Sequence, residues 1–146
     1  MEAFKDEILH TKEYAFVSIS TPLLSNLSMV ENIALILQVH EKLSRNKAQK
    51  RAFDALHSLH LDRLAPLRYD VCSIQDIFYV QLIRAFVQKG AKIVIDQPFV
   101  FLNEQTDINF ILEALDALLV PYQDVTIIDL EHQKSHYKEV SCHIQE

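Results

Sequence analysis

At 146 residues the chain has the length of a single domain. Its apolar fraction of 49% and charged fraction of 23% are ordinary for a globular protein, and no apolar run approaches the ~18 residues typical of a membrane span. The net charge of −6 argues against a nucleic-acid surface, which needs clustered lysine and arginine. Two cysteines make no disulfide framework, and the first residues do not resemble a signal peptide, so we expect a cytoplasmic protein.

The sequence is unusually poor in glycine. Average usage of ~7% would give about ten glycines in a chain of this length, yet Gly90 is the only one. A loop that holds phosphate groups needs glycines so that its backbone N–H groups can come close to the ligand. Neither G-x-x-x-x-G-K-[ST] nor G-x-G-x-x-G can therefore occur in this sequence, and we expect no bound nucleotide cofactor.

The first predicted elements are a short strand and two helices. The strand covers Tyr14 to Ile19, where apolar and β-branched residues precede a proline-containing loop. Ser28 and Glu31 have the spacing of a capping box, which predicts a helix that begins there and runs to about Leu43. A second helix is expected from Ser44, with alanines and leucines at helical spacing on one face.

The second half of the chain alternates helices and strands. Ser73 is a predicted N-cap for a largely apolar helix that continues through Gln88. Residues 92–96 and 125–130 are uniformly hydrophobic, which is typical of parallel strands buried on both faces. Between them, apolar residues from Ile108 to Leu118 recur at helical spacing and predict a crossover helix.

This order predicts an α/β domain with a parallel sheet core. We expect one domain over residues 1–146, in which residues 27–66 form a helical insert and residues 133–146 form a polar tail.

A known family shares the order of motifs between Ser73 and Pro98. A serine-capped helix carries Arg84-Ala85 and leads into a hydrophobic strand that ends in Asp96-Gln97-Pro98. This arrangement resembles the nucleotide-binding domains of ABC transporters, in which a signature loop and an A-R-A-like helix precede a Walker B strand ending in D-E-P. The resemblance extends from Tyr14 to about His132 and implies the fold of the C-terminal part of a P-loop ABC ATPase domain. No counterpart of the P-loop is present.

The positions that contact nucleotide in that family are altered in the first half of the match. The glutamine of the Q-loop falls on Ile19, which cannot coordinate metal or water. Ser73 aligns with the signature serine that contacts a γ-phosphate, but the two signature glycines become Ile74 and Gln75, and Asp76 adds a negative charge beside them. We therefore interpret Ser73 as a helix cap and its phosphate-binding role as vestigial.

The Walker B and switch positions are altered as well. Asp96 matches the aspartate that holds Mg²⁺, but Gln97 replaces the catalytic glutamate, and an amide cannot act as a general base. Asn103 stands in place of the D-loop aspartate, and His132 fits the switch histidine. These positions are interpreted as vestigial, and the chain is expected not to be an enzyme.

A different part of the match is well preserved. Residues 23–32 follow the family stretch L-L-x-x-L-T-V-x-E-N, beside the Q-loop, which in the family faces the membrane permease. The predicted partner-binding residues are Leu23, Leu24, Leu27, Glu31 and Asn32. The resemblance implies a non-catalytic accessory or regulatory protein that contacts an ABC permease or a genuine ATPase subunit. Such a protein would reach the inner face of the membrane only through the permease.

Two alternatives remain open. The C-terminal edge of a parallel sheet is where ligands bind in open α/β folds, so Asp96, Asp129 and His132 could serve a remodelled enzyme or a small-ligand site. Self-assembly into a homo-oligomer is the other alternative.

Metal binding is not predicted. Histidine and cysteine occur in two groupings, but neither has a common zinc-site spacing. The groupings are His57 with His60, and His132 with His136, Cys142 and His143.

Overall fold

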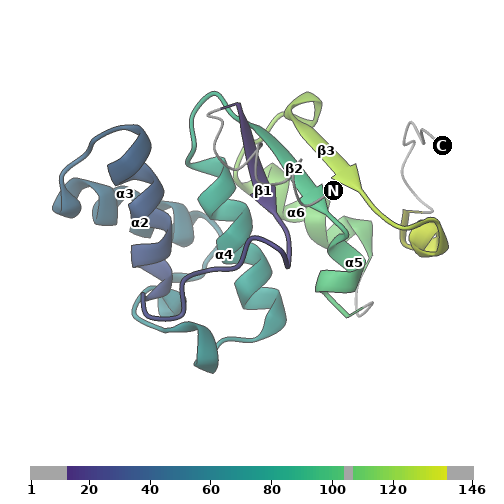
Figure 1. The fold of residues 1–146 in the computed structure, drawn as a ribbon, viewed down its shortest axis with the longest axis horizontal. Coiled ribbons are helices and arrows are strands. Elements are labelled where there is room, and N and C mark those ends of the chain that lie inside the picture. The colour runs from purple at the N-terminus through teal and green to yellow at the C-terminus, as the bar shows by residue number, and fades with distance from the viewer. Residues whose placement is uncertain (1–12, 104–106, 138–146) are drawn as a thin grey trace.

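The computed structural model describes residues 13–103 and 107–137 and has a small parallel sheet packed against helices (Figure 1). The strands are β1 (Tyr14–Val17), β2 (Lys92–Asp96) and β3 (Val125–Ile128), hydrogen-bonded in the order β1-β2-β3. Both pairs are parallel, and Ile95 of β2 lies between Val17 and Ile127 in register. The predicted α/β fold with a parallel sheet is confirmed.

Helices make both connections between the strands. β1 leads to β2 through α2 (Met29–His40), α3 (Arg45–Ser58) and α4 (Ile74–Phe86), and β2 leads to β3 through α5 (Pro98–Phe101) and α6 (Ile108–Ala117). Short 3₁₀ helices are η1 (Asp62–Leu64), η2 (Tyr69–Val71), η3 (Tyr122–Asp124) and η4 (Glu131–Tyr137). Among residues 13–103 and 107–137, no helix is long and apolar enough to cross a membrane.

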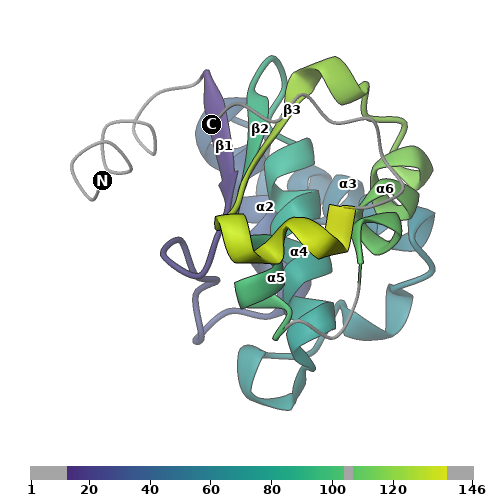
Figure 2. The ribbon, with the colours of Figure 1, turned by 90° about the vertical axis from the view of Figure 1, so that its right-hand side faces the viewer.

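Both connections place their helices on the same face of the sheet. Connections between parallel strands are almost always right-handed, and here both steps, from β1 to β2 and from β2 to β3, move in one direction across the sheet. Helices α4 and α6 therefore lie on one side, as Figure 2 shows with the strands seen nearly edge-on.

The two faces of the sheet differ in burial. Ala15, Val17, Ile93 and Ile95 point toward the helices and belong to the main hydrophobic core. On the opposite face, Phe16 and Val94 form a small separate cluster. Strand β3 takes little part in either, because its residues alternate between half-buried and exposed. The prediction that this strand is buried on both faces is wrong, since β3 is an edge strand with one face in solvent.

The main core is centred on an aromatic side chain of α4. Phe78 is fully buried, and its ring meets that of Phe101 edge-on, with the centroids 5.3 Å apart. The ring of Phe110 on α6 lies 6.0 Å from it. Phe78 thus links α4 to both helices of the second connection, which explains why α4 is apolar on most sides.

The predicted helix starts are confirmed. Ser28 and Glu31 form a complete capping box at the start of α2, and Ser44 caps α3 through the N–H of Lys47. Ser73 caps α4, and its reciprocal bond with Asp76 makes a second capping box. Each cap satisfies backbone N–H groups that have no partner inside the helix, so the local sequence alone predicts these helix starts.

The predicted element ends were less accurate. Helix α2 ends at His40 rather than near Leu43, and α4 ends at Phe86 rather than Gln88. The strands β1 and β3 end at Val17 and Ile128, two residues earlier than predicted. The chain leaves β1 early because Ser18 turns to bond with other elements.

Most helices end without glycine. Four helices are followed, one residue after the C-cap, by a residue of positive φ, which is a position that favours glycine. These residues are Lys42, His60, Asn103 and Leu119, with φ of 53°, 58°, 57° and 59°. Gly90, the single glycine, also has positive φ (79°).

Candidate functional site

The loop between β1 and α2, residues 18–28, begins at the carboxyl end of the sheet and is fixed there by a buried polar network. The N–H of Ser18 donates to Oε1 of Gln81 on α4 (2.9 Å), and its hydroxyl donates to Oδ2 of Asp96 at the end of β2 (3.0 Å). All three side chains are buried. Because buried polar groups are costly unless bonded, these contacts determine where the loop begins.

A second anchor comes from Arg84 on α4. Its guanidinium donates to the carbonyl oxygens of Thr21 (2.5 Å) and Pro22 (3.1 Å). Burial lowers the pKa of Arg84 to about 10, so the side chain remains charged at neutral pH. A charged group held against two backbone carbonyls makes strong hydrogen bonds. The middle of the loop is thus bound to the same helix as its start.

The third anchor is Asn32 on α2, which is buried. Its amide oxygen accepts from the N–H of Leu24 (2.7 Å), and its amide nitrogen donates to the carbonyls of Leu24 (3.0 Å) and Ser28 (3.1 Å). Next to it, the carboxylate of Glu31 accepts from the N–H of Ser28 (3.0 Å). This hydrogen bond holds the pKa of Glu31 below its ordinary value.

The anchored loop presents apolar side chains to solvent. Ile19 is 56% exposed and Leu24 is 47% exposed, although both are large aliphatic residues. Rigid backbone and exposed apolar side chains together are typical of a protein-binding surface. The sequence predicted Leu24 for this role but identified Ile19 only as the position of a lost glutamine.

The other predicted partner-binding residues are less accessible. Leu23 is 4% exposed and belongs to the core, and Asn32 is 2% exposed and holds the loop. Leu27 and Glu31 are half-buried. The accessible part of the predicted surface is therefore Leu24, flanked by Leu27 and Glu31.

The Walker B-like residues lie beneath this loop. The carboxylate of Asp96 is 5% exposed and accepts from the Ser18 hydroxyl, which agrees with its interpretation as a structural residue. Gln97 has a left-handed backbone (φ 50°, ψ 57°) and donates its N–H to the carbonyl of Ile128 (2.6 Å). Its side chain is the N-cap of α5 but makes no capping bond.

Ser73 and Asp76 are occupied with local structure. The Ser73 hydroxyl accepts from the N–H of Asp76 (3.1 Å), and the Asp76 carboxylate accepts from the N–H of Ser73 (3.3 Å). Nη2 of Arg63 lies 3.2 Å from the Asp76 carboxylate. The interpretation of Ser73 as a helix cap is confirmed, and Asp76 keeps a negative charge beside it.

The residues after β3 contact one another and α5. Oδ2 of Asp129 accepts from the hydroxyl of Tyr137 (2.7 Å), and the ring of His136 stacks on Phe99 of α5 with the centroids 4.4 Å apart. His132 is exposed, with its Nε2 3.2 Å from the amide nitrogen of Gln133. Asp129 therefore ties η4 to the end of β3.

Histidine and cysteine side chains do not gather into a metal site within residues 13–103 and 107–137, where no group of three or more possible ligands was found. Nδ1 of His57 instead lies 2.7 Å from the carboxylate of Asp62, which raises the pKa of His57. Cys142 and His143 lie outside the described residues.

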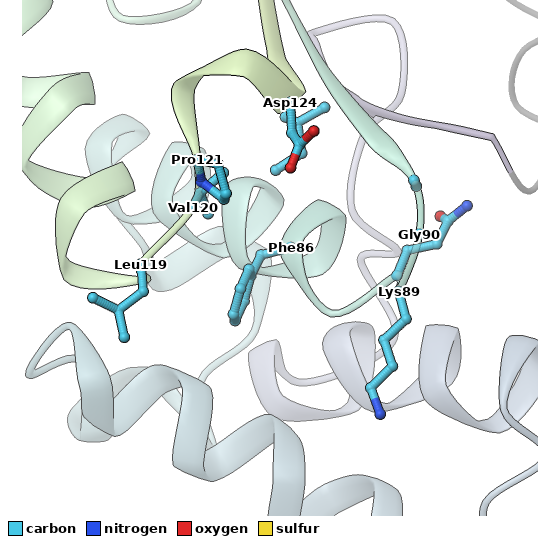
Figure 3. A pocket seen from close by; sticks show the side chains of 10 residues that line it. Phe86, Lys89, Gly90, Leu119, Val120, Pro121 and Asp124 are labelled. Carbon is cyan, nitrogen blue, oxygen red and sulfur yellow. The ribbon is translucent and has the colours of Figure 1, made fainter.

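A small cavity of about 150 Å³ lies at the opposite end of the sheet from the anchored loop (Figure 3). It is formed where α4 ends, β2 begins and the segment between α6 and β3 passes. Its lining residues are Phe86, Gln88, Lys89, Gly90, Ala91, Ile93, Leu119, Val120, Pro121 and Asp124. Parallel α/β sheets bind ligands at the carboxyl ends of their strands, so this cavity is not where the fold would place an active site.

Comparison with known proteins identifies the fold. The structure is similar to a dimeric structure of MJ0796, a bacterial ABC transporter cassette, with a TM-score of 0.61 and 22% sequence identity over 87% of this chain and 56% of that chain. It is also similar to an ATP-binding subunit of an ABC transporter, with a TM-score of 0.60 and 18% identity over 92% of this chain and 55% of that chain.

The chain thus spans about half the length of these solved structures. No protein-family model matches the sequence, and neither does any curated protein. At this level of identity the likeness concerns the fold: the molecule has part of the fold of an ABC transporter ATP-binding cassette.

Proposed function

We propose that this protein is a non-catalytic relative of the ABC transporter cassettes that acts through protein contacts at the loop of residues 18–28. The observation that carries the proposal is the combination of three anchors, at Ser18, Arg84 and Asn32, with two exposed apolar side chains, Ile19 and Leu24. A loop held in one conformation loses little entropy when a partner binds.

The chemistry at the carboxyl edge of the sheet supports a non-catalytic role. Gln97 is neutral and cannot take a proton from water, and Asp96 is buried with a bond from Ser18. An isoleucine, Ile19, stands where the family has a glutamine. These residues do not assemble the charges that phosphoryl transfer needs.

The partner we propose is an ABC permease or a genuine ATPase subunit, since the solved structures of similar fold are described as parts of ABC transporters. The protein would then work in the cytoplasm, at the inner face of the membrane, without a bound nucleotide or metal.

Affinity capture tests this role. The tagged protein is incubated with detergent-solubilised membranes of its own cells, and the bound proteins are identified by mass spectrometry. We expect a permease or an ABC ATPase to be recovered, and to be lost with Leu24→Lys because a charge enters the apolar contact. The control is Val39→Lys, which places the same charge at a residue of α2 that is 62% exposed. Equal recovery with both variants would contradict the assignment of this loop.

A second experiment tests the absence of catalysis. The triple variant Ile74→Gly, Gln75→Gly and Gln97→Glu restores the family's residues at the signature and Walker B positions. We expect no ATP turnover in a phosphate-release assay from either this variant or the original protein. Turnover by the unaltered protein would refute the non-catalytic role outright.

A further inference from the structure

Strand β3 has an open edge. It is hydrogen-bonded within the sheet only to β2, and the carbonyl of Ile128 faces β2 because it accepts from Gln97. In a parallel pair, alternate residues bond to the same neighbour, so Val125 and Ile127 direct their backbone groups the other way. The N–H of Val125 already donates to Tyr122. The carbonyl of Val125 and both backbone groups of Ile127 have no hydrogen-bond partner among the described residues.

The side chains of this edge do not protect it. Natural edge strands commonly carry a lysine, a proline or an inward-facing charge that prevents further pairing. The sequence of β3 is Val-Thr-Ile-Ile, with none of these. Thr126 and Ile128 point to the face without helices and are exposed, Ile128 by 47%, and Leu130 beyond the strand is 43% exposed.

We propose that the open edge of β3 binds an extended strand from a second polypeptide, which adds to the sheet. The inference rests on the proposed role in protein contacts and names a second surface for it. Strand addition takes its affinity from backbone hydrogen bonds and its specificity from the alternate side chains. Since β3 has four residues, the bound segment is short.

The charges around β3 indicate the chemistry of that segment. Asp124 directly precedes the strand and Asp129 directly follows it, so a carboxylate lies at each end of the edge. Glu131 is exposed one turn further on. A segment with β-branched residues in the middle and a lysine or arginine at each end complements this pattern.

A second copy of this chain fits less well. Two identical strands related by a two-fold axis pair antiparallel, and this brings the Asp124 end of one copy to the Asp129 end of the other. Like charges meet at both ends of such a ribbon, and each copy carries a net charge of −6. Charge complementarity therefore favours a basic segment of a different chain.

A peptide titration tests the proposal. The probe is the end-capped heptapeptide Lys-Val-Thr-Val-Thr-Val-Lys, added to the ¹⁵N-labelled protein while its amide chemical shifts are recorded. We expect saturable changes concentrated at residues 125–128. The matched probe is the same peptide with its central valine N-methylated, which has the same charge but lacks one donor. We expect it to bind about tenfold more weakly, the usual effect of one lost hydrogen bond.

Two protein variants complete the test. Ile128→Lys should weaken binding of the peptide at least about tenfold by adding a like charge and removing an apolar contact, whereas Val39→Lys on α2 should leave it unchanged. Equal binding of both peptides, or shifts outside β3, would overturn strand addition. A dimer in sedimentation that Ile128→Lys abolishes would overturn the choice of partner. Membrane capture depends on Leu24, so failure of the peptide test leaves that result standing, and the reverse also holds.

Discussion

The two edge strands of the sheet have opposite surroundings. In β1, Ala15, Phe16 and Val17 are at most 6% exposed, whereas β3 alternates half-buried residues with exposed ones. Both strands are four residues long and both pair with β2. The difference lies in the continuation of the chain: β1 runs into a loop anchored to α4 and α2, while β3 runs into η4, which packs on α5. Burial of an edge strand therefore depends on the segment after it more than on its own sequence.

The largest test of this comparison places the same charge on both edges. Val17→Lys buries a lysine that has no acidic partner, so we expect a loss of at least ~4 kcal/mol and an unfolded or barely folded protein. Ile128→Lys places its charge in solvent and should change the free energy of unfolding by no more than ~0.5 kcal/mol. Urea denaturation followed by circular dichroism measures both values. Similar losses in the two variants would mean that the two edges do not differ as described.

A smaller effect is expected from the network that ends β1. Gln81→Leu fills the same space but removes the acceptor for the Ser18 N–H, which stays buried. Leaving such a group without a partner costs ~1–3 kcal/mol. The control is Gln38→Leu, on the half-buried side of α2. If the two variants were equally stable in urea, the Ser18 contact would not be what holds the start of the loop.

The anchor at Arg84 should act more locally. Arg84→Met keeps the aliphatic stem but loses both bonds to the loop, and it also removes a buried charge, so we expect a global loss of only ~1 kcal/mol. The amides of residues 19–27 should exchange with solvent markedly faster, as measured by hydrogen–deuterium exchange. Arg63→Met, which loses an exposed pair with Asp76, should leave exchange in the loop unchanged.

The smallest effect concerns acid. The pKa of Glu31 is lowered in the folded protein, first by its bond from the backbone of Ser28. A lowered pKa contributes stability above the unfolded value of about 4.5, and this contribution is lost as the pH falls through the folded pKa. Glu31→Gln retains a capping side chain without the titration. Its free energy of unfolding should fall less than that of the original protein between pH 6 and about pH 3.

Local sequence signals predicted much of the fold. Ser28, Ser44 and Ser73 each announced a helix because an N-cap acts within three residues of itself. The apolar residues of β2 likewise predicted a buried strand. They could not show that β3 is exposed, because a hydrophobic run does not reveal how many neighbours a strand has.

The site was less predictable because its contacts are long-range. Ser18 meets Gln81 and Asp96 across 63 and 78 residues of chain, and Arg84 reaches back to Thr21 across 63. No periodicity in the sequence links such positions. A polar residue within an apolar helix, such as Gln81, was the one available signal, since such residues are usually buried only when they are bonded.

The near-absence of glycine has a consequence for engineering this protein. Lys42, His60, Asn103 and Leu119 each occupy a helix-terminal conformation that costs an ordinary L-residue on the order of 1 kcal/mol. Leu119 is also 86% exposed, so its replacement by glycine sacrifices little packing. Because the four residues follow four different helices, gains from substituting them should add. The molecule thus has an unused reserve of thermal tolerance, which can be reached without altering either proposed binding surface.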